Sequence, residues 1–63
     1  MIKIIKRELI TIGQGDAGRY EYQDIPGVVE SGDKVHRVTV ESVGGREFLH
    51  FKHEKNANEF TGK

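Results

Sequence analysis

Residues 35–53, VHRVTVESVGGREFLHFKH, are the part of this 63-residue chain that decides its fold. Two runs rich in valine and phenylalanine flank Gly44-Gly45. A glycine pair is typical of the two-residue loop of a β-hairpin, where both loop residues take positive φ. This loop pairs Val40 with Leu49 and gathers four apolar residues on one face: Val38, Val40, Leu49 and Phe51. The pattern predicts an antiparallel hairpin with one buried face.

The opposite face of the predicted hairpin carries a phenylalanine among basic residues. The candidate contact residues on this face are Arg37, Arg46, Phe48, His50 and Lys52. An aromatic ring among basic side chains on a sheet is a common way to hold single-stranded nucleic acid. Glu41 on the same face and a net charge of zero weaken that interpretation. We therefore expect these residues to contact a protein partner, with nucleic acid as the alternative; burial of Phe48 in a core or dimer interface is a third reading.

Histidines are the only metal-ligand candidates that the pattern brings together. The same register places His36 opposite His53, and cross-strand Cβ atoms lie about 5 Å apart. Two imidazoles without a third ligand make a weak metal site, so we expect no metal and no cofactor. Two protonated histidines would repel each other, which predicts a loss of stability below about pH 6.

The rest of the chain shows short apolar segments separated by glycine, proline and serine. Residues 2–12 fit either a helix or a strand, and their isoleucine content favours a strand or a bulged strand. Residues 19–25 and 27–30 predict two more short strands. The tail from Glu54 onward predicts at most one helical turn, with Phe60 as an anchor on the sheet.

Together these segments predict a single small β domain over residues 1–63. The expected fold is mainly β, an antiparallel meander of four or five short strands. Such a meander either closes into a partly open barrel of SH3-like or OB-like kind, or leaves a bare face for a second copy to cover. The second arrangement predicts a homodimer, since an open edge strand is a template for pairing.

A Gly-x-Gly-x-x-Gly pattern at Gly13, Gly15 and Gly18 raises the question of phosphate binding. In dinucleotide sites this pattern opens a helix whose N-terminus faces the pyrophosphate. Here two tyrosines, an isoleucine and a proline follow within eight residues, so no such helix is expected. We interpret the segment as a turn whose glycines supply positive φ, with a mobile partner-binding loop as the alternative.

Composition narrows the class of function further. The chain contains no cysteine, which excludes disulfides and thiolate nucleophiles. A domain this small has little room for a preformed substrate pocket, and no serine or carboxylate pattern indicates catalysis, so we expect no enzyme. Charges interrupt the apolar run at the N-terminus, so neither a secretory signal nor a membrane span is predicted, and a cytoplasmic protein is expected.

These observations lead to one functional expectation and one alternative. We expect a small binding or regulatory module that acts through protein–protein contacts on an exposed face or edge of its sheet. The alternative is a β module that binds single-stranded nucleic acid through Arg37, Phe48 and Lys52.

Overall fold

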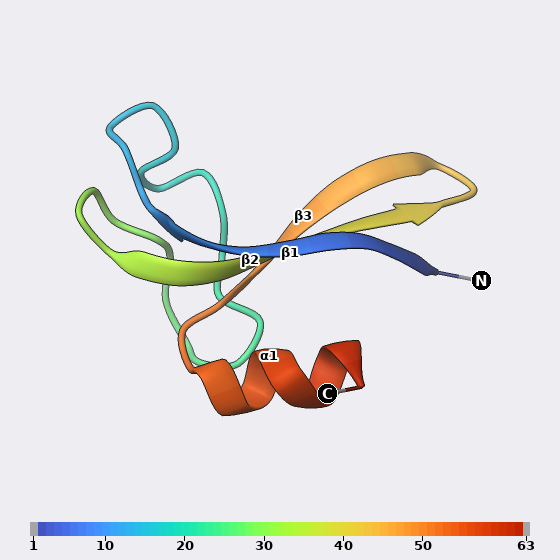
Figure 1. The fold of residues 1–63 in the computed structure, drawn as a ribbon. Coiled ribbons are helices and arrows are strands. Elements are labelled where there is room, and N and C mark those ends of the chain that lie inside the picture. The colour runs from blue at the N-terminus through green and yellow to red at the C-terminus, as the bar shows by residue number, and fades with distance from the viewer. Residues whose placement is uncertain (1, 63) are drawn as a thin grey trace.

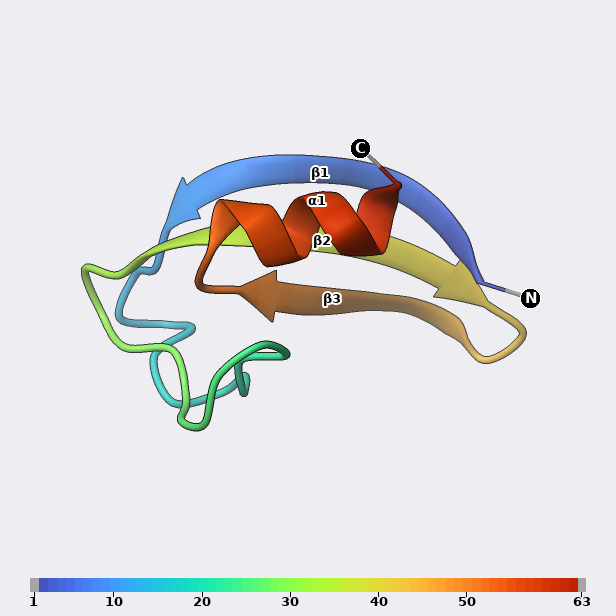
Figure 2. The same ribbon diagram turned by 90° about the horizontal axis from the view of Figure 1, so that it is seen from below.

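The computed structural model describes residues 2–62 and consists of one sheet and one helix. The strands are β1 (Lys3–Thr11), β2 (Lys34–Ser42) and β3 (Gly45–Phe51), and the helix is α1 (Glu54–Thr61). The sheet is antiparallel in the order β1-β2-β3. The helix packs against one face of the sheet and runs along it (Figures 1 and 2).

The mainly β, antiparallel character is confirmed, but the strand count is smaller than expected. The sheet of the described residues has three strands instead of four or five, and it is open, with β1 and β3 as its two edges. The predicted strands at 19–25 and 27–30 form only isolated bridges, one between Glu21 and Val28 and one between Tyr22 and His50. Turn residues on both sides leave each segment too short to form a ladder.

β1 settles the ambiguity of the N-terminal segment in favour of a bulged strand. Ile4 pairs with Val40 and Lys6 pairs with Thr39, so Ile5 has no partner on β2. An extra residue in one strand moves the following side chains to the other face. The bulge thereby reconciles the irregular spacing of the isoleucines with an extended backbone.

The predicted hairpin is present, but its turn lies one residue earlier than expected. Ser42 pairs with Gly45, so the loop is Val43-Gly44. Of the pair Gly44-Gly45, only Gly45 takes positive φ, at 118°. This fits an ordinary turn followed by a glycine rather than a primed turn. The register shifts by two residues, which keeps every side chain on its predicted face, because side chains alternate with a period of two.

Two small cores lie on opposite faces of the sheet, and the central strand β2 contributes to both. The first lies under the helix and contains Val38, Val40, Phe51 and Ala57, with Leu49 packed against it. The second lies under residues 12–33, the long connection from β1 to β2, and contains Ile12, Val29 and Val35, with Ile10, Tyr20 and Tyr22 around it. The helix therefore covers one face of the sheet, while the long connection packs on the other face and then passes the edge of β3 toward the start of the helix (Figures 1 and 2).

The C-terminal segment forms two turns of helix where one was expected. Asp24 of the long connection accepts hydrogen bonds from the backbone N–H groups of Lys52 (2.9 Å) and His53 (3.0 Å) and from the side chain of Asn56 (3.0 Å). An anionic oxygen at this end also interacts favourably with the helix dipole. Phe60 packs on Phe51 with ring centroids 5.4 Å apart, in the anchoring position expected for it. The helix is too short to span a membrane, and the described residues contain no helix that could.

Candidate functional site at the edge of β3

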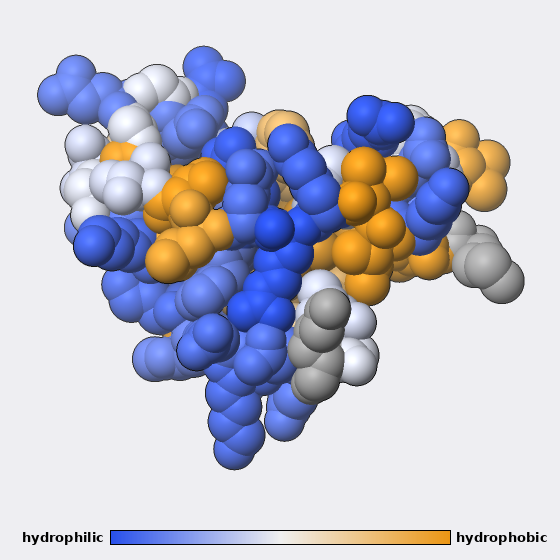
Figure 3. Space-filling model, viewed as in Figure 1, coloured by the Kyte–Doolittle hydropathy of each residue, from blue (hydrophilic) through white to orange (hydrophobic). Residues whose placement is uncertain are grey.

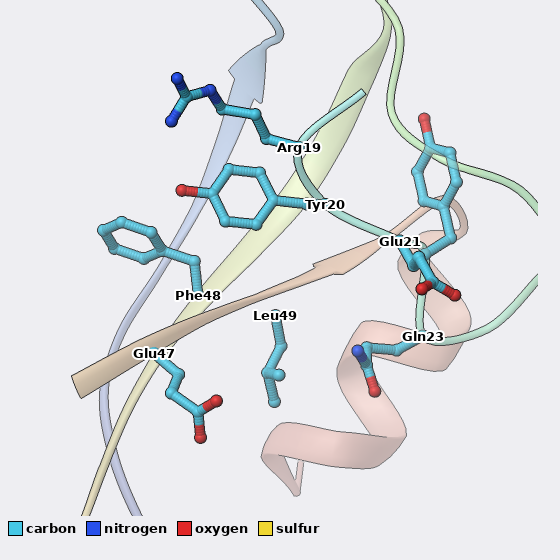
Figure 4. Close-up of a pocket in the computed structure, with 8 residues that line it drawn as sticks. Arg19, Tyr20, Glu21, Gln23, Glu47, Phe48 and Leu49 are labelled. Atoms are coloured by element: carbon cyan, nitrogen blue, oxygen red, sulfur yellow. The ribbon is translucent and has the colours of Figure 1, made fainter. Parts of the chain in front are cut away.

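An open cleft of about 490 Å³ lies between the long connection and the outer edge of β3. Residues 19–23 form one wall, and residues 47–49 form the other. Figure 4 shows the rings of Tyr20 and Phe48 next to each other on one side of the strand, whereas Glu47 and Leu49 point away from them. The cleft thus follows the edge of a strand and offers different side chains above and below it.

The backbone of β3 is closed at one end of this edge and open at the other. The carbonyl of His50 accepts a hydrogen bond from the N–H of Gln23 at 2.8 Å, so the His50 amide faces outward. Amides alternate between the two edges of a strand, and the Phe48 amide therefore faces outward as well. Among the described residues, no side chain and no carbonyl outside the strands accepts a hydrogen bond from the Phe48 N–H.

Next to the cleft, the side chain of Arg37 connects β2, β3 and the glycine-containing loop. Its Nε donates to Nε2 of His50 at 3.0 Å, and its Nη2 donates to a carboxylate oxygen of Asp16 at 3.2 Å. Its guanidinium carbon lies 4.6 Å from the centroid of the Phe48 ring and 5.9 Å from that of Tyr20. The rings of Tyr20 and Phe48 meet edge to face at 6.3 Å. This cluster fixes the aromatic wall of the cleft.

His50 is fully buried within this cluster. Burial lowers the pKa of its imidazole, the neighbouring Arg37 lowers it further, and Asp16 acts in the opposite direction. Because Nε2 accepts a hydrogen bond, the proton of the neutral ring lies on Nδ1, which has no partner among the described residues. The tyrosine ring of Tyr20 covers the imidazole at a centroid distance of 4.5 Å.

The loop that contains the three glycines is a turn that places Asp16, and its geometry does not fit a phosphate. The N–H of Asp16 donates to the carbonyl of Gly13 at 3.1 Å, and Gly18 takes φ of 76° while its N–H donates to the carbonyl of Val29. The carboxylate of Asp16 faces Arg37. A phosphate in this position would meet a negative charge.

Of the five predicted contact residues, three come together and two lie at the ends of the hairpin. Arg37, Phe48 and His50 form the cluster beside the cleft. Arg46 instead lies 3.7 Å from Glu41 near the turn, and Lys52 lies 5.8 Å from the ring of Tyr22. The sequence predicted that these residues share one face of the hairpin. An error of two residues in the register does not change the face of a side chain.

The pairing of His36 with His53 was wrong. His36 lies opposite Phe51, and His53 is the residue that precedes helix α1. The shift of the turn separates the two imidazoles, which removes the geometric basis for a shared metal ion and for their mutual repulsion. No group of three potential metal ligands occurs among the described residues.

The sequence pattern missed the opposite wall of the cleft. Tyr20 and Glu21 line it from the long connection, and this segment was interpreted as a regular strand. In the structure Tyr20 and Tyr22 both pack against the second core. Nothing in the local sequence signals that this face covers His50.

Charges at the cleft are mixed, with a small acidic excess. Glu21 and Glu47 contribute two negative charges and Arg19 one positive charge to its walls. The neighbouring arginines already have acidic partners, as Arg37 does in Asp16 and Arg46 in Glu41. This arrangement favours a partner with basic side chains over a phosphate backbone.

Comparison with other proteins adds no functional assignment to this geometry. No protein family, curated protein or solved structure matches the chain.

Proposed function

We propose that this protein is a small binding module that takes up an extended segment of a partner protein at the outer edge of β3. The observation that carries this proposal is the open cleft along that edge, with the outward-facing Phe48 amide inside it. An incoming segment in extended conformation would pair its own backbone with β3 and act as a fourth strand, which is the usual geometry of strand addition. The proposal needs no closed barrel.

The side chains around the edge suit such a segment. Phe48 is 43% exposed and offers an aromatic surface on one side of the strand, whereas Leu49 and Glu47 face the other side. Successive residues of an added strand point to opposite faces. One set would therefore contact Phe48 and Tyr20, and the alternate set would meet Leu49 and the carboxylate of Glu47.

β1 offers the other open edge, and its side chains make it a poorer docking surface. Lys3, Lys6 and Arg7 place charges along the strand, and lysines on an edge strand oppose pairing with another sheet. The exposed apolar residues near it are Ile2, Ile4 and Leu9. Figure 3 shows hydrophobic side chains in two separate areas on this side, with hydrophilic side chains between them.

The alternative function is binding of single-stranded nucleic acid through Arg37, Phe48 and Lys52. The test must distinguish it from peptide binding. Arg37 beside the cleft is paired with Asp16, and Arg46 near the turn of the hairpin is paired with Glu41, so both already have an acidic partner in place of a phosphate. Affinity through phosphate contacts falls steeply with salt. Salt dependence therefore separates the two functions.

The test uses peptides of about ten residues, the upper range of strand length, selected from a random display library on the intact protein. A chain made by chemical ligation with N-methyl-Phe48 lacks only the outward N–H, and N-methyl-Leu9 is the matched control on the outer edge of β1. We expect the first change to weaken peptide binding by about tenfold or more and the second to leave it unchanged. Failure to select any peptide, equal effects of both changes, or salt-sensitive oligonucleotide binding in their place would overturn the proposal.

A further inference from the structure

The hydrogen bond between Arg37 and His50 requires a neutral imidazole. Nε of Arg37 is the donor at 3.0 Å, and a guanidinium has no acceptor. A protonated imidazole carries an N–H on both ring nitrogens and has no acceptor either. Protonation of His50 therefore breaks this bond and places two cations at hydrogen-bond distance in a site where His50 is fully buried.

Arg37 contacts both His50 and the loop. Its side chain is only 15% exposed, and its second contact is the carboxylate of Asp16 at 3.2 Å. The groups that face His50 are Arg37 from β2 and Asp16 and Tyr20 from the long connection. On β1, Glu8 lies opposite Arg37, but its carboxylate lies 3.6 Å from Lys6. Among the described residues, Asp16 is therefore the acidic group that His50 and Arg37 would compete for.

No residue of the loop from 13 to 20 is buried, and residues 13–15 and 18–19 are exposed. A Cβ atom added at Gly13 or Gly15 would meet no atom within 4 Å, so both residues have open space on that side. Besides the contact of Asp16, two backbone hydrogen bonds join the loop to Val29. The N–H of Gly18 donates to the Val29 carbonyl at 2.8 Å, and the N–H of Val29 donates to the Tyr20 carbonyl at 2.9 Å. Tyr20 follows directly, covers His50 and forms one wall of the cleft.

We propose that Asp16, Arg37 and His50 form an acid-sensitive latch that holds the loop of residues 13–20 on the sheet. Protonation of His50 expels Arg37 from its position, releases the loop and displaces Tyr20 from Phe48. The consequence for ligand binding rests on the proposed function: the latch would close the aromatic wall of the cleft at neutral pH and open it in acid. The latch itself is a property of the free protein.

The test is an NMR titration of the intact, isotope-labelled protein without any peptide, from about pH 8 to about pH 5, the range in which histidines titrate. It follows the imidazole signal of His50 and the amide signals of residues 13–20, with residues 6–10 of β1 as an internal reference. We expect the loop amides to shift with the midpoint of His50, below about 6.5, while the reference amides stay in place.

Two variants sharpen this titration. His50→Gln keeps a side-chain oxygen that can accept from Arg37 and removes the titration, so its loop signals should not change over this range. Asp16→Asn removes the carboxylate that favours the protonated ring, so it should lower the His50 midpoint.

Three results would overturn the latch. They are loop signals that ignore the His50 midpoint, an identical loop transition in wild type and His50→Gln, and a loss of all native signals at once. The wild-type titration decides by itself if the buried substitution fails to fold. If acid releases the loop but the peptide affinity is the same at neutral and acid pH, the latch is supported. Its link to the cleft is then contradicted.

Discussion

Phe48 is the residue whose environment separates a binding role from a purely structural one. It is 43% exposed and contacts Arg37 and Tyr20 at the rim of the cleft. Phe51, three residues further along β3, is 6% exposed and belongs to the core under the helix. The two phenylalanines of this strand thus have different environments, because even and odd positions face opposite sides of the sheet.

This difference predicts unequal effects of two truncations. Phe48→Ala should cost about 1 kcal/mol of unfolding free energy, since it loses one aromatic pair and one cation–π contact at the surface. Phe51→Ala should cost about 3–5 kcal/mol, as is typical of a buried aromatic side chain. Urea denaturation measures both. A Phe48→Ala protein that fails to fold would show that this ring is core and would remove it from the candidate site.

At the scale of elements, the helix depends on a residue far from it in sequence. The carboxylate of Asp24 is partly buried, which favours its neutral form, but hydrogen bonds from Lys52, Asn56 and His53 outweigh burial and lower its pKa. These bonds join the long connection to the start of α1 and fix the closed end of the cleft near Gln23. The helix and the cleft wall are therefore expected to loosen together.

Asp24→Ala tests this coupling. Loss of a capping carboxylate with several hydrogen bonds should lower the unfolding free energy by about 1–3 kcal/mol, with faster hydrogen exchange in α1 and in residues 19–23. Glu30→Ala, an exposed carboxylate of the same connection, is the matched control and should have little effect. In wild type the contribution of Asp24 is present above about pH 4 and is lost as pH falls through its lowered pKa. Equal effects of the two alanine variants would contradict the capping role.

The bulge in β1 makes a second prediction at the scale of elements. Ile5 has no partner on β2, whereas Ile4 and Lys6 pair with consecutive residues. Deletion of Ile5 would leave a regular ladder in which all remaining side chains of β1 keep their present face. Deletion of Glu8 would move all residues on one side of it to the wrong face.

We therefore expect the chain without Ile5 to fold with a stability within about 1 kcal/mol of wild type, the usual range for a tolerated change. The chain without Glu8 should be largely unfolded. Circular dichroism and urea denaturation of the two deletions make the comparison. Similar loss of structure in both would show that the bulge itself is required.

The hairpin and the segment of Tyr20 and Tyr22 show how far the sequence predicts this fold. The faces of the hairpin were predictable because alternation depends only on the parity of positions, and an error of two residues in the turn preserves it. The partners across the strands were not, since Gly44-Gly45 is compatible with two turn geometries. The segment of Tyr20 and Tyr22 had the composition of a strand, yet its packing on His50 and on the second core depends on tertiary contacts with no local signal.

At the scale of the whole molecule, the chain measures 31 × 25 × 19 Å and has little apolar surface to spare. The long connection is held to the sheet partly through polar contacts: Asp16 with Arg37, and Tyr22, whose hydroxyl donates to Asp33 at 2.8 Å. Burial, together with this bond to Asp33, raises the pKa of Tyr22 to about 12. Because few contacts hold the long connection, the loss of one of them can affect the stability of the whole molecule.

Acid should destabilise the protein through His50. Its pKa is lowered in the folded state, so the unfolded chain binds more protons once the pH falls below about 6.5. The unfolding free energy should be highest above this value and should decrease from about pH 7.5 toward about pH 5. Urea midpoints across this range measure the effect, and His50→Gln should flatten the curve. The sign agrees with the expectation drawn from His36 and His53, but a different residue is responsible. A wild-type curve as flat as that of His50→Gln would contradict this account.

We propose that β3 takes up an extended partner segment along its outer edge. Hydrogen exchange of the Phe48 amide, measured in the free protein and with a saturating selected peptide, tests it most directly. We predict rapid exchange in the free protein, because this N–H faces the open cleft, and a slowing of at least about tenfold in the complex, with the outer-edge amide of Leu9 unchanged. A Phe48 amide that exchanges at the same rate in both states would show that the ligand binds elsewhere and would contradict strand addition at β3.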